Sequence, residues 1–290
     1  MKPIRSSLTR ESKDPTAGRV IRIVLFLALV LPFARGAEPE DLLKQAGEAI
    51  QAGRTNEALT LITQAIDAQP TNATAWFVRG VVYSRMQRHT NAIADFDRAA
   101  KLEPKPIVFQ HRGVEHFRAG NFEKSVSDFD KFIELVPSQA AQHWQRGISL
   151  YYARKFEEGA KQFELHKTVN PNDVENAVWH FLCVTRASGL EKAKTSLMPI
   201  EGDTRVPMKE VHALFAGKAK ADDVLAAAKE SKGEDGMFYA HLYLGLYYEA
   251  IGDKDKTREH IFNAARDFKA PHYMGDVARV HARVLENEKR

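Results

Sequence analysis

Cysteine is almost absent from this sequence, since Cys183 is the only one among 290 residues. A single thiol cannot form an internal disulfide, so the fold must be stabilised by a hydrophobic core. Hydrophobic residues make up 44% of the chain, which is enough to supply that core and argues against global disorder. The sequence also lacks a Gly-x-Ser-x-Gly motif, a phosphate-binding glycine loop and a dinucleotide fingerprint, so nothing points to the enzyme classes that depend on them.

Metal-binding motifs are missing as well, although the chain has 11 histidines. His111 and His116 are five residues apart, roughly 500° of rotation along a helix, so they lie on different faces. His143 and His166 fall on different predicted helices. No His-Glu-x-x-His pattern and no Cys/His pair of ligand spacing occurs. We therefore expect no metal site and no cofactor.

His180 and Cys183 form the one arrangement that resembles a nucleophile and its base, because they are three residues apart on one predicted helix. The cysteine, however, lies in the apolar run Phe181-Leu182-Cys183-Val184. A cysteine in such a run is usually a small buried hydrophobic residue whose raised pKa leaves the thiol unreactive. We therefore expect that the chain is not an enzyme.

Net charge is small once the N-terminal segment is set aside. The whole chain carries +4, but residues 1–36 hold seven basic and two acidic residues, so residues 37–290 carry a net charge of −1. A nearly neutral body lacks the electrostatic footprint of phosphate-backbone binding, and nucleic acid is excluded as the expected partner.

The N-terminal segment has the order of a secretory signal peptide. A basic stretch ends at Arg22, and an apolar run of twelve residues follows from Ile23 to Ala34, broken only by Pro32. Small residues then stand at −3 and −1 of a cut before Ala37. The apolar run is shorter than the ~20 residues that span a bilayer. These features predict a cleaved signal peptide over residues 1–36 and an exported body in the periplasm or at the cell surface. The alternative is an uncleaved leader that anchors the chain in the inner membrane.

An internal repeat is the main positive signal. Prolines recur at Pro70, Pro104, Pro137 and Pro171, with spacings of 34, 33 and 34 residues. Three further series keep the same period, two of small residues and one of large apolar residues: Ala46, Gly80, Gly113 and Gly147; Ala58, Ala92, Ser125 and Gly159; Ile62, Phe96, Phe129 and Phe163. A shared period of this length over four units indicates a solenoid of repeated helix pairs.

The period and its markers resemble the tetratricopeptide-repeat (TPR) family. The unit from Ala73 to about Pro106 has Trp76, Gly80, Tyr83, Ala92, Phe96, Ala99 and Pro104 at the consensus positions. The resemblance implies two antiparallel helices per unit, with the small residues allowing close approach and the large residue filling the space between helices. In units three and four, Phe132 and His166 stand where units one and two have Ala65 and Ala99, which predicts looser packing there.

The C-terminal third continues with less regular units. A helix pair between Val174 and Pro199 keeps only part of the pattern, and Phe181 replaces its small residue. Short amphipathic helices split by Gly217 come next, followed by a clear unit with Gly245 and Ile261 and by a last helix over Tyr273–Leu285.

We therefore expect an all-α fold, a TPR helical-hairpin solenoid with a non-TPR helical insertion and a C-terminal capping helix. Its predicted parts are a signal peptide (1–36), four TPR units (37–172), a degenerate TPR-like hairpin (173–199), a helical insertion (200–236), a last TPR unit (237–270) and a capping helix (271–290).

This order of units is similar to that of a bacterial TPR lipoprotein family, in which TPRs, a non-TPR insertion and a final TPR pair form a scaffold. The match includes the segment from Phe238 to Ala265. The resemblance implies a scaffold that brings a periplasmic protease to cell-wall hydrolases. The lipid-attachment cysteine of that family is absent here.

In a TPR stack, the first helices of successive units line a concave face. The residues predicted to face this groove are Phe77, Val81, Arg85, Gln110, Val114, Phe117, Arg118, Trp144, Ile148, Tyr151 and Tyr152. An apolar, aromatic groove edged by arginines suits an apolar helix or an extended peptide with an acidic group. The alternative is that these aromatics pack against the next helix or against the C-terminal part of the chain itself. Val81 and Val114 stand where chaperone-binding TPRs have an asparagine, so we do not expect that partner class.

The resulting functional hypothesis is an exported scaffold or adaptor that holds a protein or peptide in its groove, as a monomer or a homodimer, in cell-envelope protein turnover or assembly. Membrane contact is expected only through an uncleaved leader. The alternative hypothesis is a structural subunit of an envelope export or secretion complex.

Overall fold

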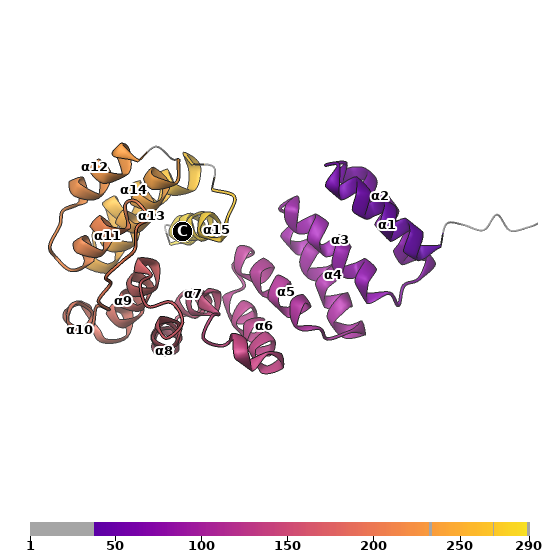
Figure 1. Cartoon of the computed structure of the whole chain (residues 1–290), viewed down its shortest axis with the longest axis horizontal. Helices are drawn as coiled ribbons and strands as arrows, with labels where there is room; N and C mark the ends of the chain where they lie inside the picture. The colour runs from indigo at the N-terminus through magenta and orange to yellow at the C-terminus, as the bar shows by residue number, and fades with distance from the viewer. Residues whose placement is uncertain (1–37, 232–233, 269, 289–290) are drawn as a thin grey trace, which may run out of the picture. The chain divides into compact units, whose positions relative to one another are not determined.

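The computed structural model describes residues 38–231, 234–268 and 270–288, and within these ranges it contains fifteen α-helices, one 3-10 turn and no strand (Figure 1). The all-α prediction is thus confirmed. In chain order the helices are α1 (Pro39–Gln51), α2 (Thr55–Ala68), α3 (Ala73–Arg85), α4 (His89–Leu102), α5 (Pro106–Arg118), α6 (Phe122–Leu135), α7 (Trp144–Tyr152), α8 (Phe156–Lys167), α9 (Val174–Ser188), α10 (Leu190–Thr195), α11 (Met208–Phe215), α12 (Ala221–Glu230), α13 (Glu234–Ile251), α14 (Lys254–Arg266) and α15 (Tyr273–Asn287).

The first eight helices form four sequential hairpins, here called units one to four, and each second helix packs on its own first helix and on the next unit (Figure 1). The glycines of the repeat are the points of closest approach. An added Cβ would lie 2.6–2.7 Å from the nearest ring carbon in three pairs: Gly80 with Phe96, Gly113 with Phe129, and Gly147 with Phe163. The hairpin α13–α14 repeats this contact between Gly245 and Ile261, at 2.6 Å. The interpretation of the small and large residue series is therefore confirmed.

The turns inside the hairpins all use a left-handed residue, but only some of them use glycine. Gly53, Gly120 and Gly252 have φ of 73°, 80° and 84°. Units two and four place Gln87 (φ 57°) and Arg154 (φ 61°) at the equivalent position, where a side chain is disfavoured.

Unit four departs from the other units in its first helix. A 3-10 turn over Pro137–Gln139 takes the place of a helical turn, and α7 has 9 residues where α3 and α5 have 13. His143 is the N-cap of α7, and its Nδ1 accepts a hydrogen bond of 3.3 Å from the backbone amide of Arg146. The first helix of unit four is therefore about one turn shorter than those of units two and three, but it still carries the four groove residues predicted for this unit.

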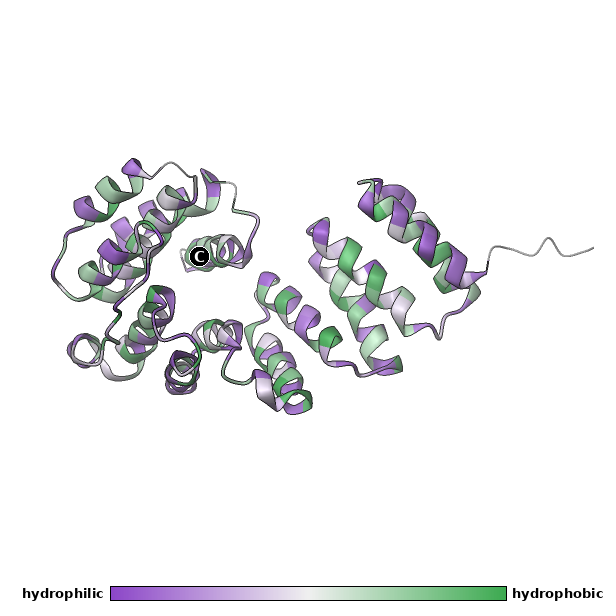
Figure 2. Cartoon of the chain, viewed as in Figure 1, coloured by the Kyte–Doolittle hydropathy of each residue, from purple (hydrophilic) through white to green (hydrophobic). Residues whose placement is uncertain are grey.

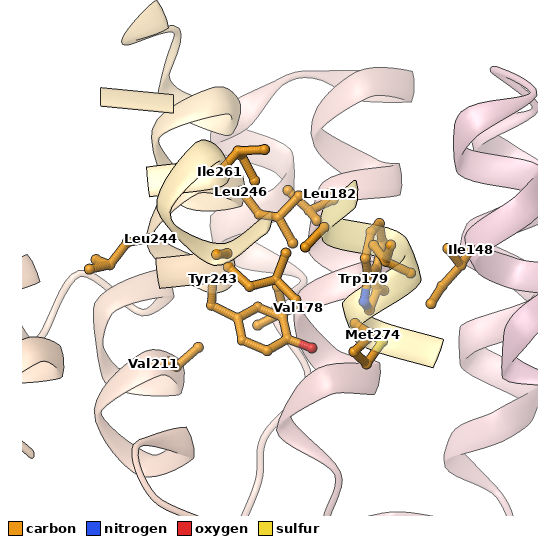
Figure 3. Packing of buried hydrophobic residues seen from close by; sticks show 14 of the residues in the cluster. Ile148, Val178, Trp179, Leu182, Val211, Tyr243, Leu244, Leu246, Ile261 and Met274 are labelled. Carbon is orange, nitrogen blue, oxygen red and sulfur yellow. The ribbon is translucent and has the colours of Figure 1, made fainter. Parts of the chain in front are cut away.

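Most of the core lies in the C-terminal two thirds of the described chain. One continuous cluster of buried residues extends from Phe117 in α5 to Leu285 in α15, whereas α1–α5 share two small clusters. Figure 3 shows the centre of the large cluster, where Trp179 of α9, Tyr243 of α13 and Met274 of α15 lie near one another. In Figure 2 most helices are hydrophilic along one part of their surface and hydrophobic along another, as expected of helices packed on one side.

The degenerate pair α9–α10 accepts Phe181 at the small-residue position because α10 has only 6 residues and α11 of the insertion packs on α9 as well. The Phe181 ring meets Phe215 of α11 edge-on, with 5.1 Å between ring centroids.

The last helix, α15, packs on α14 and also reaches back to α5, far from it in the sequence (Figure 1). The predicted signal peptide, residues 1–36, lies outside the described residues. No helix in the described part of the chain has the length and apolar character needed to cross a membrane.

Candidate partner-binding surface

Helix α15 covers the groove of units three and four. The ring of Phe117 stacks on Tyr273 and that of Trp144 meets Tyr273 edge-on, both with centroids 5.2 Å apart. The Tyr152 hydroxyl lies 2.8 Å from Nδ1 of His281. Phe117, Trp144 and Tyr152 therefore follow the alternative to an open groove, because they pack against the C-terminal part of the same chain.

Two more of the predicted groove residues are inside the core. Ile148 is 1% exposed and Tyr151 is 5% exposed. The Tyr151 hydroxyl donates a hydrogen bond of 3.0 Å to Glu249 of α13, and Glu249 also pairs with Arg186 at 3.3 Å. The expectation of a groove open to a partner is therefore wrong for Ile148 and Tyr151, because inter-helix packing uses both side chains.

Arg118 fastens α15 to α5. Its Nε donates to Asp276 of α15 at 2.7 Å, and its Nη1 donates to Glu115 at 2.5 Å and to Ser84 of α3 at 3.0 Å. Burial lowers the pKa of Arg118, but the carboxylates of Asp276 and Glu115 outweigh it and hold the pKa above its ordinary value. Most of its hydrogen-bonding capacity is thus used within the chain.

The other predicted groove residues lie on α3 and α5, beside the part that α15 covers. Val81, Val114 and Phe77 are half-buried, and Arg85 is exposed. The Gln110 amide is already used, because it donates to Gln145 and contacts Nε2 of His143, both at 2.7 Å. That Phe77, Val81, Arg85 and Val114 contact a partner stays a prediction. We call these four residues the open face.

A pocket of about 320 Å³ adjoins the open face, between the α3–α4 turn, the end of α5 and α15. We call it the arginine pocket; its ionisable lining residues are Arg85, His89, Arg118, Asp276, Arg279 and Arg283. A shallower pocket that includes Arg88 continues from it across the same turn. The sequence indicated Arg85 and Arg118 but gave no signal for Arg279 and Arg283, because they belong to a helix expected only to cap the far end of the stack.

The two carboxylates beside the arginine pocket are already paired. Asp276 accepts from Arg118 and, at 2.6 Å, from Arg279. Glu115 is 1% exposed, accepts from Ser84 and Arg118, and lies 2.7 Å from Nδ1 of His89. Among the described residues, Arg85 and Arg88 have no ion-pair partner, and Arg283 donates only to the backbone oxygen of Arg118. The pocket therefore has more positive charge than the protein neutralises.

A larger pocket, about 580 Å³, lies between α8, α9, α13 and the start of α15. Its charged residues satisfy one another. Arg205 donates to Asp173 at 2.6 Å, to Glu175 at 2.5 Å and to Asp203 at 2.6 Å, and Tyr243 donates to Glu175 at 2.6 Å. Burial raises the pKa of Glu175, against the opposing effect of these donors. We interpret this network as a clamp that fixes the loop around Arg205 to α9.

Cys183 has the environment expected of a buried hydrophobic residue. It is fully buried, its Sγ lies 2.8 Å from where a Cβ on Gly159 would be, and burial raises the pKa of the thiol. Nε2 of His180 lies 3.4 Å from a carboxylate oxygen of Glu164, so the ring pairs with Glu164 and not with the thiol. In the described part of the chain, no three His, Cys, Asp or Glu side chains are grouped so as to hold a metal ion.

Comparison with known proteins agrees with this geometry. Residues 43–105, which span units one and two, match the tetratricopeptide repeat family model. The same hairpin, with the same glycine–phenylalanine contact, continues in units three and four. The chain contains tetratricopeptide repeats. TPR proteins are typically scaffolds that bind other proteins and are not enzymes, and the extended surface of the stack is their binding surface.

Solved structures show that the TPR fold extends beyond the matched residues. A tetratricopeptide repeat protein from Parabacteroides merdae ATCC 43184 aligns with a TM-score of 0.58 and 14% identity, over 86% of this chain and 98% of that one. A MamA protein aligns with a TM-score of 0.51 and 12% identity, over 67% and 96% of the two chains. MamA from Desulfovibrio magneticus RS-1 gives 0.50 and 13%, over 56% and 92%. At these identities the similarity concerns the fold alone.

Proposed function

We propose that this TPR protein is an exported adaptor that holds a partner protein on the open face of α3 and α5. The observation that carries the proposal is the division of the groove by α15. Units three and four are filled by the chain's own helix, whereas the open face keeps half-buried apolar side chains beside unpaired arginines. Apolar side chains next to uncompensated charge suit the binding of a second protein.

Site-specific photo-crosslinking tests this proposal. A photoreactive amino acid is placed at Val114 on the open face in one variant, and at Lys161, exposed on α8, in a matched control variant. We expect one defined adduct from Val114 in the native envelope and none from Lys161. Adducts from Lys161 but not from Val114 would show that the partner binds elsewhere. Trp144 and Tyr151 are unsuitable probes, because their substitution would disturb the contact with α15 or the core.

Export is the second part of the proposal. It is supported by the order of basic, apolar and small residues in the leader and by the resemblance to bacterial TPR lipoprotein scaffolds, which act in the periplasm. Fractionation followed by N-terminal sequencing tests it. We expect a mature chain that begins at Ala37 in the periplasmic or cell-surface fraction. A chain that retains its leader in the inner-membrane fraction would support the anchored alternative, and a cytosolic chain would refute export.

The alternative role, a structural subunit of an envelope complex, requires a chain that depends on assembly for its stability. The large cluster between Phe117 and Leu285 is already complete within the chain. In the described residues, the exposed large hydrophobic side chains are single residues on separate helices and loops, such as Ile107, Leu165 and Ile251. Gel filtration of the purified protein separates the two roles. We expect a stable, defined species, whereas an obligate subunit would aggregate or degrade alone.

A further inference from the structure

The arginine pocket differs from the larger pocket in its charge, because its cations outnumber the carboxylates that line it or lie beside it. Four arginines from α3, α5 and α15 line it, namely Arg85, Arg118, Arg279 and Arg283, and Arg88 of the α3–α4 turn lines the shallower pocket that continues from it. The two carboxylates beside them, Glu115 and Asp276, are fully used by Arg118, Arg279, Ser84 and His89. Over the two adjoining pockets, five arginines and two carboxylates leave a charge of +3, on Arg85, Arg88 and Arg283.

The larger pocket provides the contrast. There a single arginine, Arg205, forms ion pairs with three carboxylates, so the same count leaves an excess of negative charge and no cation for an anionic ligand. Uncompensated like charges around a cavity raise the local concentration of ions of the opposite sign, so the arginine pocket attracts anions and the larger pocket does not.

The environment of Arg283 agrees with this excess. Burial and the neighbouring Arg279 lower the pKa of Arg283 below its ordinary value, against the weaker opposing effects of Asp276 and Glu286. Nearby positive charge lowers the pKa of a basic group, and a carboxylate bound beside Arg283 would raise its pKa again. The guanidinium donates to the Arg118 carbonyl at the end of α5, which leaves its other N–H groups available.

The position of the pocket connects it with the open face. Arg85 follows Val81 by four residues on α3, and Arg118 follows Val114 by four residues on α5, so each arginine stands one helical turn beyond an apolar residue of that face. A segment lying across Val81 and Val114 therefore reaches the pocket with the side chains that come next along it.

We propose that the arginine pocket binds carboxylates of an acidic segment of the partner, whose apolar residues contact Val81 and Val114. The bonds are charge-assisted hydrogen bonds from Arg85 and Arg283 to Asp or Glu side chains, for which the planar guanidinium is well suited. Helix α15 thus has a second role beside closing units three and four, because it supplies half of the anion site. The proposal rests on the adaptor function for the identity of the ligand, but anion binding can be measured separately.

The experiment uses the purified protein and fluorescein-labelled twelve-residue probes, with Leu-Glu-Glu repeated four times as the acidic probe and Leu-Gln-Gln as its neutral counterpart. Fluorescence anisotropy measures the dissociation constants at low and high salt. We expect the acidic probe to bind more tightly and more salt-dependently. Arg85→Gln/Arg283→Gln should weaken its binding roughly fivefold to tenfold, as for two exposed ion pairs, and leave the neutral probe unchanged. Both side chains are largely exposed, and the substitutions remove one hydrogen bond, from Arg283 to the Arg118 carbonyl, so the melting temperature should fall by only a few degrees.

A matched double variant removes the same charge elsewhere. Lys161→Gln/Lys192→Gln changes exposed residues of α8 and α10. Equal weakening by the two double variants, or no binding of the acidic probe, would refute the pocket. Tighter binding of a labelled single-stranded oligonucleotide, lost in the arginine variant, would also refute it by assigning the site to nucleic acid. If Val114 crosslinks a partner whose affinity the arginine variant does not alter, the adaptor function stands and the pocket proposal fails.

Discussion

Gly113→Ala tests the physical basis of the repeat. The added methyl carbon would lie 2.6, 2.8 and 3.2 Å from three ring carbons of Phe129, which is fully buried. The ring cannot retreat easily, because His143 lies against it with centroids 4.6 Å apart. Overpacking of this kind costs about 3 kcal/mol at the upper end of its usual range. Alanine recovers about 1 kcal/mol through its higher helix propensity, so we expect a net loss of about 2 kcal/mol.

Gly47→Ala is the matched control. Gly47 also lies within a helix, α1, but nothing is within 4 Å of where its Cβ would be. Here only the propensity term acts, and we expect a gain of about 1 kcal/mol. Urea denaturation followed by circular dichroism should therefore separate the two variants by about 3 kcal/mol. Phe129→Leu added to Gly113→Ala should restore part of the loss. A Gly113→Ala protein as stable as Gly47→Ala would refute the close-approach interpretation of the small-residue series.

Three further predictions follow from the described contacts. Burial lowers the pKa of His143 to about 4, below the value of about 6.5 for an unfolded histidine. As the pH falls from about 6.5 to 4, the unfolded chain binds a proton first, so about 3 kcal/mol of stability that is present at neutral pH is lost through His143 alone. The difference in the free energy of unfolding between pH 7 and pH 4.5 should therefore be smaller in His143→Asn, which keeps a side-chain acceptor at the start of α7. Asp276→Asn removes the carboxylate that pairs with Arg118, so it should cost about 2 kcal/mol and speed hydrogen exchange in α15, whereas unchanged exchange would show that the pair does not hold the helix. Cys183, fully buried and with its pKa raised by burial, should react with a disulfide reagent at pH 8 only after denaturation.

The repeat was predictable because its signals are local. Within one hairpin, a glycine in the first helix and a phenylalanine sixteen residues later indicate where the two helices pack together, and a proline marks the end of the second helix. Repetition over four units makes such signals specific. The turns were less predictable, because Gln87 and Arg154 adopt the left-handed conformation without the glycine that usually marks it.

The candidate site was predictable only in part. Sequence register predicts that Val81 and Val114 face the groove, and in the structure both are half-buried. It could not show that Arg118 meets Asp276, 158 residues away, because α15 carries no repeat signal that fixes its position. The sequence predicts an open groove at the aromatic residues of units three and four for the same reason, because contact with Tyr273 of the same chain and contact with a bound peptide require the same apolar side chains.

The position of α15 restricts how a partner can bind. The aromatic part of the groove, which would suit an apolar helix, is filled by a helix whose own buried residues, such as Val277 and Leu285, belong to the large core cluster. Displacing it would expose that apolar surface to water, at a cost of roughly 1.5–3 kcal/mol for each large side chain. A partner therefore gains more by binding beside α15 than by replacing it. Beside α15 the apolar residues of α3 and α5 are few and the arginines many, so charge rather than apolar area is expected to decide which proteins this TPR stack accepts.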